Sequence, residues 1–127
     1  MDKAAMVSLD VDLGLEIVEK LDQAGLKVSV ALWAFLSEYS DWRLILASRQ
    51  FDSVGLRDAY GLLHDASDAA GIIPERAPLM MILPMNDSFI RDLRRRFGKA
   101  KSVEGMRLGG QMFGDRFIED AYVYRIA

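Results

Sequence analysis

The sequence predicts an α+β fold, a two-layer sandwich with a mixed, mostly antiparallel sheet and the element order α-β-β-α-β-α-β-β. Three observations support this prediction. In three segments apolar residues recur at helical spacing, and in other segments apolar and polar residues alternate with a period of two. A Gly-Asp pair late in the chain indicates a tight hairpin. Hairpins at both ends favour this class over a doubly wound parallel sheet. We expect residues 1–127 to form a single domain of this kind.

The amino-terminal part begins with a helix and continues into a hairpin. Asp10 or Asp12 caps the helix, whose apolar residues recur at helical spacing until Gly25, a typical C-terminal stop. From residue 26 the period becomes two, and the apolar segments 26–36 and 42–47 flank a short polar turn. An antiparallel hairpin is the simplest interpretation, and a helix through the end of the first segment and the turn is the alternative.

A second helix and a third strand are expected in the middle of the chain. The helix opens at Asp52 or Ser53, carries one apolar face and ends at Gly71. After a loop bracketed by prolines, residues 79–83 form a continuous apolar run. A run of this length is typical of a strand covered on both faces, which predicts a central position in the sheet.

The last elements are a helix and a second hairpin. A polar residue at 86–88 caps the helix, which ends before Gly98. Segments 108–113 and 116–126 then flank a Gly-Asp pair, one of the two-residue combinations that favour tight hairpins. With this hairpin the predicted element order is complete.

Composition excludes several classes of protein. The chain has no cysteine, which excludes disulfides, thiol catalysis and thiolate metal sites. The first 14 residues carry three aspartates and no apolar run, so no signal peptide is expected. The longest apolar stretch, 28–36, is far shorter than the ~20 residues of a membrane span. We expect a soluble, cytoplasmic protein that does not associate with membranes.

No catalytic or cofactor signature is present. His64 is the single histidine, whereas a zinc site needs three or four ligands. Asp58, Asp65 and Asp68 lie close together on the second predicted helix, where a solvated polar face is favoured over a Mg²⁺ site. The phosphate-loop, dinucleotide and nucleophile-elbow motifs are all incomplete or missing. We therefore expect no metal and no cofactor, and we name no catalytic residue.

Positive charge is concentrated in one short segment. The chain has a net charge of −3, but residues 87–107 carry 7 basic and 3 acidic side chains. Within the third predicted helix, apolar residues form one stripe and arginines occupy the rest of the surface. Ordinary pairing with acidic neighbours and with the helix dipole is the favoured interpretation. The residues predicted to contact an anion or a partner are Arg91, Arg94, Arg95, Lys99 and Lys101.

Aromatic residues of the first hairpin form the second candidate surface. Large aromatic side chains are enriched in the cores of protein interfaces. Tyr39 lies in the polar turn and Trp42 follows it, so these two are the predicted interface aromatics. Trp33 and Phe35 are instead expected to pack in the core.

These observations favour a non-enzymatic binding or accessory module that acts through protein–protein contacts. The expected partners are a second copy of the chain, because twofold dimers are the commonest soluble oligomers, and an acidic protein that meets the arginine helix. Nucleic acid or another polyanion, bound through residues 88–101, is a less favoured alternative. A small enzyme with an unrecognised Asp, Glu, Arg and Tyr site is the other alternative.

Overall fold

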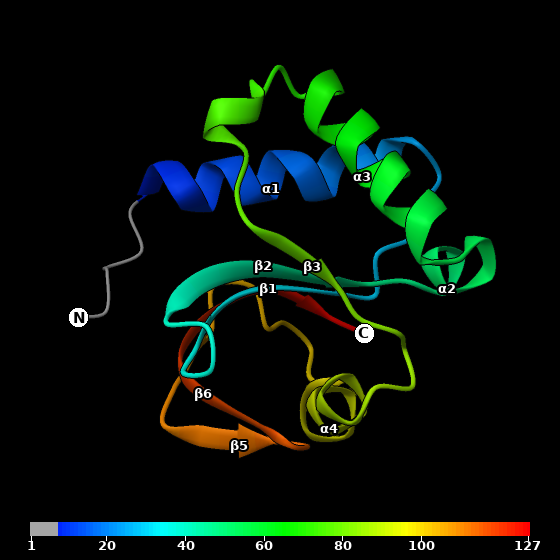
Figure 1. The fold of residues 1–127 in the computed structure, drawn as a ribbon. Coiled ribbons are helices and arrows are strands. Elements are labelled where there is room, and N and C mark those ends of the chain that lie inside the picture. Colours follow the sequence, from blue (N-terminus) through cyan, green and yellow to red (C-terminus); the bar gives the residue numbers. More distant parts are fainter. Residues whose placement is uncertain (1–7) are drawn as a thin grey trace.

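A computed structural model describes residues 8–127, in which helices lie on both faces of one sheet (Figure 1). In chain order the elements are α1 (Ser8–Gln23), β1 (Val30–Leu36), β2 (Asp41–Ala47), α2 (Arg49–Val54), α3 (Leu56–Ala69), the 3-10 turn η1 (Pro74–Arg76), β3 (Met80–Ile82), α4 (Ser88–Phe97), β4 (Arg107–Leu108), β5 (Gln111–Phe113) and β6 (Arg116–Ile126).

The strands form one mixed sheet in the order β3-β2-β1-β6-β4, and β5 also pairs with β6. The β2–β3 pair is parallel, whereas the other described pairs are antiparallel. The predicted α+β class and the mixed, mostly antiparallel sheet are therefore confirmed. The first hairpin, the third predicted helix and the Gly-Asp hairpin lie where the sequence places them. The first helix is also present, but it already includes Ser8, so Asp10 and Asp12 lie within it and the prediction that one of them caps it is wrong.

The layering differs from the predicted two layers, because α1 and α3 cover one face of the sheet and α4 covers the other (Figure 1). Alternation along β1 explains the difference. Val30, Leu32, Ala34 and Leu36 belong to the core beneath α4, whereas Ala31 and Trp33 belong to the core beneath α1 and α3. Every residue of β1 is buried, so the strand needs apolar cover on both sides.

The apolar run 79–83 forms an edge strand, so its predicted central position is wrong. Among the described strands, β3 pairs with β2 alone, and Leu79 at its start remains 54% exposed. The main-chain N–H of Ile82 donates a hydrogen bond to the Tyr60 hydroxyl, 3.1 Å away. Ile82 is buried in the core beneath α1 and α3, and Leu83 is buried in the core beneath α4, so helices on both faces cover this end of the edge strand.

Glycines divide two segments that the sequence predicts to be continuous. Gly55, with φ of 86°, separates α2 from α3, and the first of these helices begins at Arg49, before the predicted start. The Ser48 side chain caps α2 by accepting from the main-chain N–H of Gln50, 3.1 Å away. A bend at residues 109–110 likewise splits the predicted strand 108–113 into β4 and β5.

Helix α1 packs closely against two side chains of the sheet at Gly14, where only glycine fits. A Cβ atom on Gly14 would collide with the Tyr124 hydroxyl and would lie 2.8 Å from Trp33 Nε1. In the space that Gly14 leaves, Trp33 Nε1 donates to the Tyr124 hydroxyl over 2.9 Å, and that hydroxyl donates to the Val11 carbonyl over 2.5 Å. Burial raises the pKa of Tyr124 far above its ordinary value, so the phenol keeps its proton and remains a donor.

Replacement of Tyr124 by Phe should lower the free energy of unfolding by about 1–3 kcal/mol, because the buried Trp33 N–H loses its acceptor. Urea unfolding followed by circular dichroism measures this loss. Tyr122→Phe is the matched control, since the Tyr122 hydroxyl makes no hydrogen bond to the described residues, and its loss should stay within about 0.5 kcal/mol. Equal losses in the two variants would contradict the assigned role of this hydrogen bond.

Candidate functional site

The parallel pair of strands creates an open cleft at one end of the sheet. β2 and β3 run in the same direction, so both end on the same side of the molecule, near Ala47 and Ile82. From there the chain enters α2 after β2 and the 83–87 loop after β3. Crevices beyond the carboxyl ends of parallel strands are common ligand sites in α/β proteins. Here the diverging segments enclose a volume of about 710 Å³.

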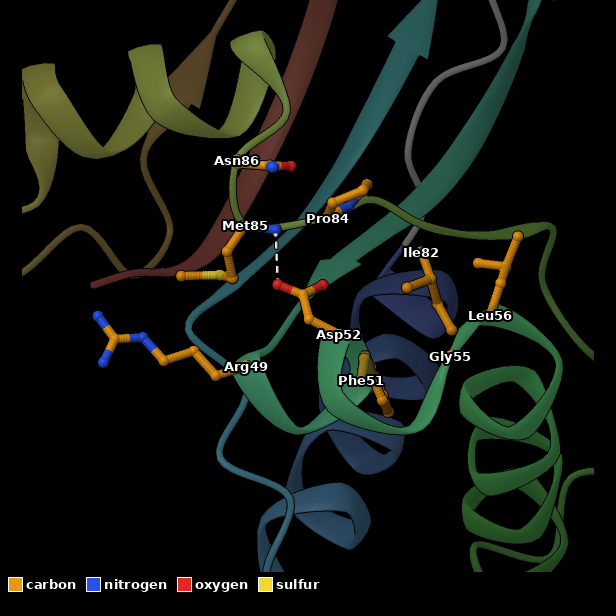
Figure 2. A pocket seen from close by; sticks show the side chains of 9 residues that line it. All are labelled: Arg49, Phe51, Asp52, Gly55, Leu56, Ile82, Pro84, Met85 and Asn86. Atoms are coloured by element: carbon orange, nitrogen blue, oxygen red, sulfur yellow. Dashed lines mark hydrogen bonds between the residues drawn. The ribbon is translucent and has the colours of Figure 1, made fainter.

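The cleft has an apolar interior and a polar margin, as Figure 2 shows. The residues that line it are Arg49, Phe51, Asp52, Gly55, Leu56, Ile82, Pro84, Met85 and Asn86. Phe51, Ile82 and Met85 are buried, whereas the Leu56 side chain at one side of the opening is 60% exposed. Arg49 lies on the opposite side from Leu56 and extends away from the interior (Figure 2). This arrangement suits a ligand with an apolar part.

Asp52 connects the two walls of the cleft. Its carboxylate Oδ2 accepts a hydrogen bond from the main-chain N–H of Met85, 3.1 Å away, and thereby ties α2 to the loop after β3 (Figure 2). The sequence predicts Asp52 as a helix cap, but the structure assigns capping to Ser48 and brings Asp52 into the cleft. The hydrogen bond bridges 33 positions of the chain, and no local pattern in the sequence signals it.

The five predicted cations do not all line the same hollow. Arg91, Arg94 and Arg95 line the same shallow hollow on α4, whereas Lys101 lines a separate one and Lys99 is exposed beyond the end of the helix. The Arg94 side chain also donates through Nε to the Ala127 carbonyl oxygen, 2.8 Å away. Contact of these side chains with an anion or a partner stays a prediction.

Asp92 neutralises part of the positive surface of α4. It forms ion pairs with Arg95 at i,i+3 spacing and with Arg96 at i,i+4 spacing. Its carboxylate Oδ2 also accepts from the main-chain N–H of Gly114, 2.9 Å away, in the turn between β5 and β6. This hydrogen bond, followed by the two arginines, lowers the pKa of Asp92 below its ordinary value of 3.8. The carboxylate is therefore a structural link between helix and hairpin.

A second contact holds the same turn against α4. The Ser88 hydroxyl donates to Asp115 Oδ1 over 2.8 Å, and this hydrogen bond is the main reason that the pKa of Asp115 is lowered. Gly114 has φ of 59°, and a Cβ atom there would lie 2.5 Å from the Ser88 carbonyl carbon. Both the conformation and the close approach require glycine at this position.

The two predicted interface aromatics lie at one end of the first hairpin. The guanidinium of Arg43 stacks over the Tyr39 ring at 3.8 Å from its centroid, and Tyr39 is exposed. Trp42 is half-buried and contacts Phe35 edge to face, with 5.7 Å between ring centroids. Trp42 therefore packs within the fold on at least one side, and Tyr39 is the more accessible of the two. Their role in an interface stays a prediction.

Metal-binding side chains do not converge in the part of the chain that the structure describes. No group of three or more His, Asp or Glu side chains there has the geometry to hold a metal ion. His64 is exposed on α3, as are Asp58, Asp65 and Asp68 on the same helix. No helix within residues 8–127 is long and apolar enough to cross a lipid bilayer.

Comparison with known proteins found no matching protein family, no similar curated protein and no similar solved structure.

The Asp92 carboxylate should contribute to stability at neutral pH and lose that contribution in acid. Because its folded pKa is lowered, the stabilisation is present above about pH 4 and falls as pH drops through the folded pKa. Asp92→Asn should therefore be less stable than the natural protein at pH 7, and the difference should shrink at pH 3. Urea unfolding at both values measures it, with the exposed Asp65→Asn as control. If Asp92→Asn lowers the free energy of unfolding equally at pH 7 and at pH 3, this assignment is wrong.

Proposed function

We propose that this protein is a non-enzymatic binding module that acts through protein–protein contacts, and that the cleft beyond β2 and β3 receives an apolar side chain of the partner. The observation that carries the proposal is the cleft itself. It is open to solvent, has a volume of about 710 Å³ and is lined mainly by apolar side chains. Apolar pockets that take a single anchoring side chain commonly provide most of the affinity of protein interfaces.

The exposure of Leu56 supports this use of the cleft. An isolated exposed leucine needs no explanation, but this one stands at the opening of an apolar hollow and continues its lining. A partner side chain in the cleft would cover both Leu56 and the buried residues behind it. Burial of a leucine-sized side chain contributes about 1.5–3 kcal/mol, which raises affinity roughly tenfold to a hundredfold.

The position of Asp52 favours binding over catalysis. It is the one carboxylate among the described residues that line the cleft, and its Oδ2 already accepts a hydrogen bond from the Met85 N–H. General acid–base catalysis usually combines a proton donor with a proton acceptor, both placed toward the reacting atoms. Asp52 instead holds the walls of the cleft together, which suits a preformed binding site.

A homodimer and a cytoplasmic location are further parts of this proposal. Met112 and Phe117 are cross-strand neighbours on the β5–β6 hairpin and are 50% and 43% exposed. Such a pair on an edge hairpin suits a small self-complementary contact between two copies. The lack of cysteine in the chain is compatible with the reducing conditions of the cytoplasm.

Leu56→Gln should weaken peptide binding at the cleft about tenfold, because it replaces apolar contact by a polar group of similar length. A random peptide library displayed on phage is selected on the natural protein, and affinities of the enriched peptides are measured by fluorescence polarisation. Leu79→Gln is the matched control, since Leu79 is similarly exposed but lies outside the cleft. If no enriched peptide binds the natural protein better than Leu56→Gln, the proposed function is wrong.

Phe117→Ser should shift the protein from dimer to monomer at micromolar concentration, because it removes half of the exposed apolar pair. Sedimentation velocity distinguishes the two states, and Leu79→Ser is the control that removes an exposed apolar side chain elsewhere. A natural protein that sediments as a monomer at all concentrations would exclude the dimer.

A further inference from the structure

A second hollow adjoins the cleft, and its lining is basic. It has a volume of about 420 Å³ and lies where β2 and β6 end and β1 begins. We call it the basic hollow, and the residues that line it are Lys27, Ser29, Arg49, Gln50, Arg94 and Ala127. Arg49 lines the cleft as well, so the two hollows share one wall.

Three cations from separate parts of the chain meet at the basic hollow. Lys27 precedes β1, Arg49 begins α2, and Arg94 lies on α4. None of the described residues that line this hollow is an aspartate or a glutamate. Lys27 and Arg49 are exposed and form no ion pair with described residues. Arg94 donates a hydrogen bond through Nε to the Ala127 carbonyl oxygen, and its two terminal nitrogens can donate to other acceptors.

We propose that the cleft and the basic hollow together form one bipartite site for a segment of a partner protein that carries an apolar residue close to an aspartate or glutamate. The apolar side chain occupies the cleft, and the carboxylate lies among Lys27, Arg49 and Arg94. This inference rests on the proposed function and names the chemistry of the partner. It also selects Arg94 from the five predicted cations and adds Arg49 and Lys27, which the sequence did not single out.

Charge complementarity supports an acidic segment. A guanidinium offers two parallel donors to a carboxylate, and a charge-assisted hydrogen bond of this kind is stronger than a neutral one. Arg94 Nε already donates to the Ala127 carbonyl oxygen, whereas Lys27 and Arg49 form no ion pair with described residues and can therefore meet an anion. Consecutive residues of an extended peptide advance about 3.3 Å each, so neighbouring hollows are reached by residues only a few positions apart.

Asp52 determines which way the partner segment lies. Its carboxylate stands in the cleft, where it would repel an acidic side chain, whereas the basic hollow attracts one. Arg49 extends away from the cleft interior, and Asp52 is directed toward the Met85 main chain (Figure 2). Repulsion at one hollow and attraction at the other together favour a single orientation of the bound segment.

The test uses the peptides selected on the natural protein in the Leu56 experiment. Enriched peptides should contain Asp or Glu close in sequence to the apolar anchor, because the two hollows share the Arg49 wall. Arg49→Ala and Lys27→Ala should each weaken such a peptide roughly threefold to fivefold, as expected for exposed charge contacts. The double variant should weaken it about tenfold, and the same peptide with the acidic residue changed to its amide should lose this sensitivity.

Matched controls separate this site from a general electrostatic effect. Arg91→Ala and Lys99→Ala remove exposed cations that line neither hollow, and they should change affinity less than twofold at 0.15 M salt, where charges far from the ligand are screened. Equal weakening by these controls would overturn the proposal in favour of diffuse charge attraction. Thermal unfolding of every variant establishes that the loss of binding does not reflect loss of structure.

Two other results are distinguishable from each other. Peptides that require Leu56 but are insensitive to Arg49, to Lys27 and to the peptide carboxylate would overturn the bipartite site and leave the cleft intact as a binding site. The absence of any Leu56-dependent peptide would overturn the cleft itself and, with it, the inference. A Leu56-dependent peptide that couples to Arg49 through its own carboxylate would support both.

Discussion

The whole architecture depends on the burial of β1. This strand pairs with β2 on one edge and with β6 on the other, and each of its residues is buried. A strand enclosed on both edges and both faces leaves no side chain in water, so its stability depends on the helices above and below. α1 and α3 provide cover on one side and α4 on the other. The close approach of α1 at Gly14, and the link between α4 and the β5–β6 turn, are both ways of closing these layers.

The cleft follows from the parallel pairing of β2 and β3. If β2 and β3 formed an antiparallel hairpin, a tight turn would join them and would leave no space at the end of β2. Instead α2, α3 and η1 carry the chain back so that β3 runs alongside β2 in the same direction. Two segments then leave the same end of the sheet and diverge, and Asp52 bridges them through the Met85 N–H. The candidate site is thus a product of topology more than of any local motif.

Much of the fold was accessible from the sequence because local patterns specify it. Alternating and helical periodicities, together with the glycines at 25, 98 and 114, locate α1, the first hairpin, α4 and the last turn. The position of β3 was not accessible, because an apolar run indicates burial but not what provides it. Here Tyr60 and the rest of α3 cover the strand that the run predicts to be central.

The candidate site was mostly inaccessible from the sequence for a related reason. Charge patterning along one helix drew attention to Arg94, but Lys27 and Arg49 lie 67 and 45 positions before it and are isolated cations in the sequence. Only the pairing of distant strands brings the three together. The ion pairs of Asp92 with Arg95 and Arg96 were foreseeable from helical spacing, whereas its hydrogen bond to Gly114 was not.

The hydrogen bond between Tyr60 and Ile82 has a consequence for how copies of this protein can associate. A filament that grows by pairing the sheets of successive molecules needs two exposed edge strands in each molecule, one for each neighbour. The Tyr60 hydroxyl accepts a hydrogen bond from an outward-facing N–H of β3, so this edge strand is less available to pair with a strand of another molecule. The opposite border, where β4 and β5 lie, has no such cover from Tyr60. Addition of a further strand at the β3 edge is therefore disfavoured.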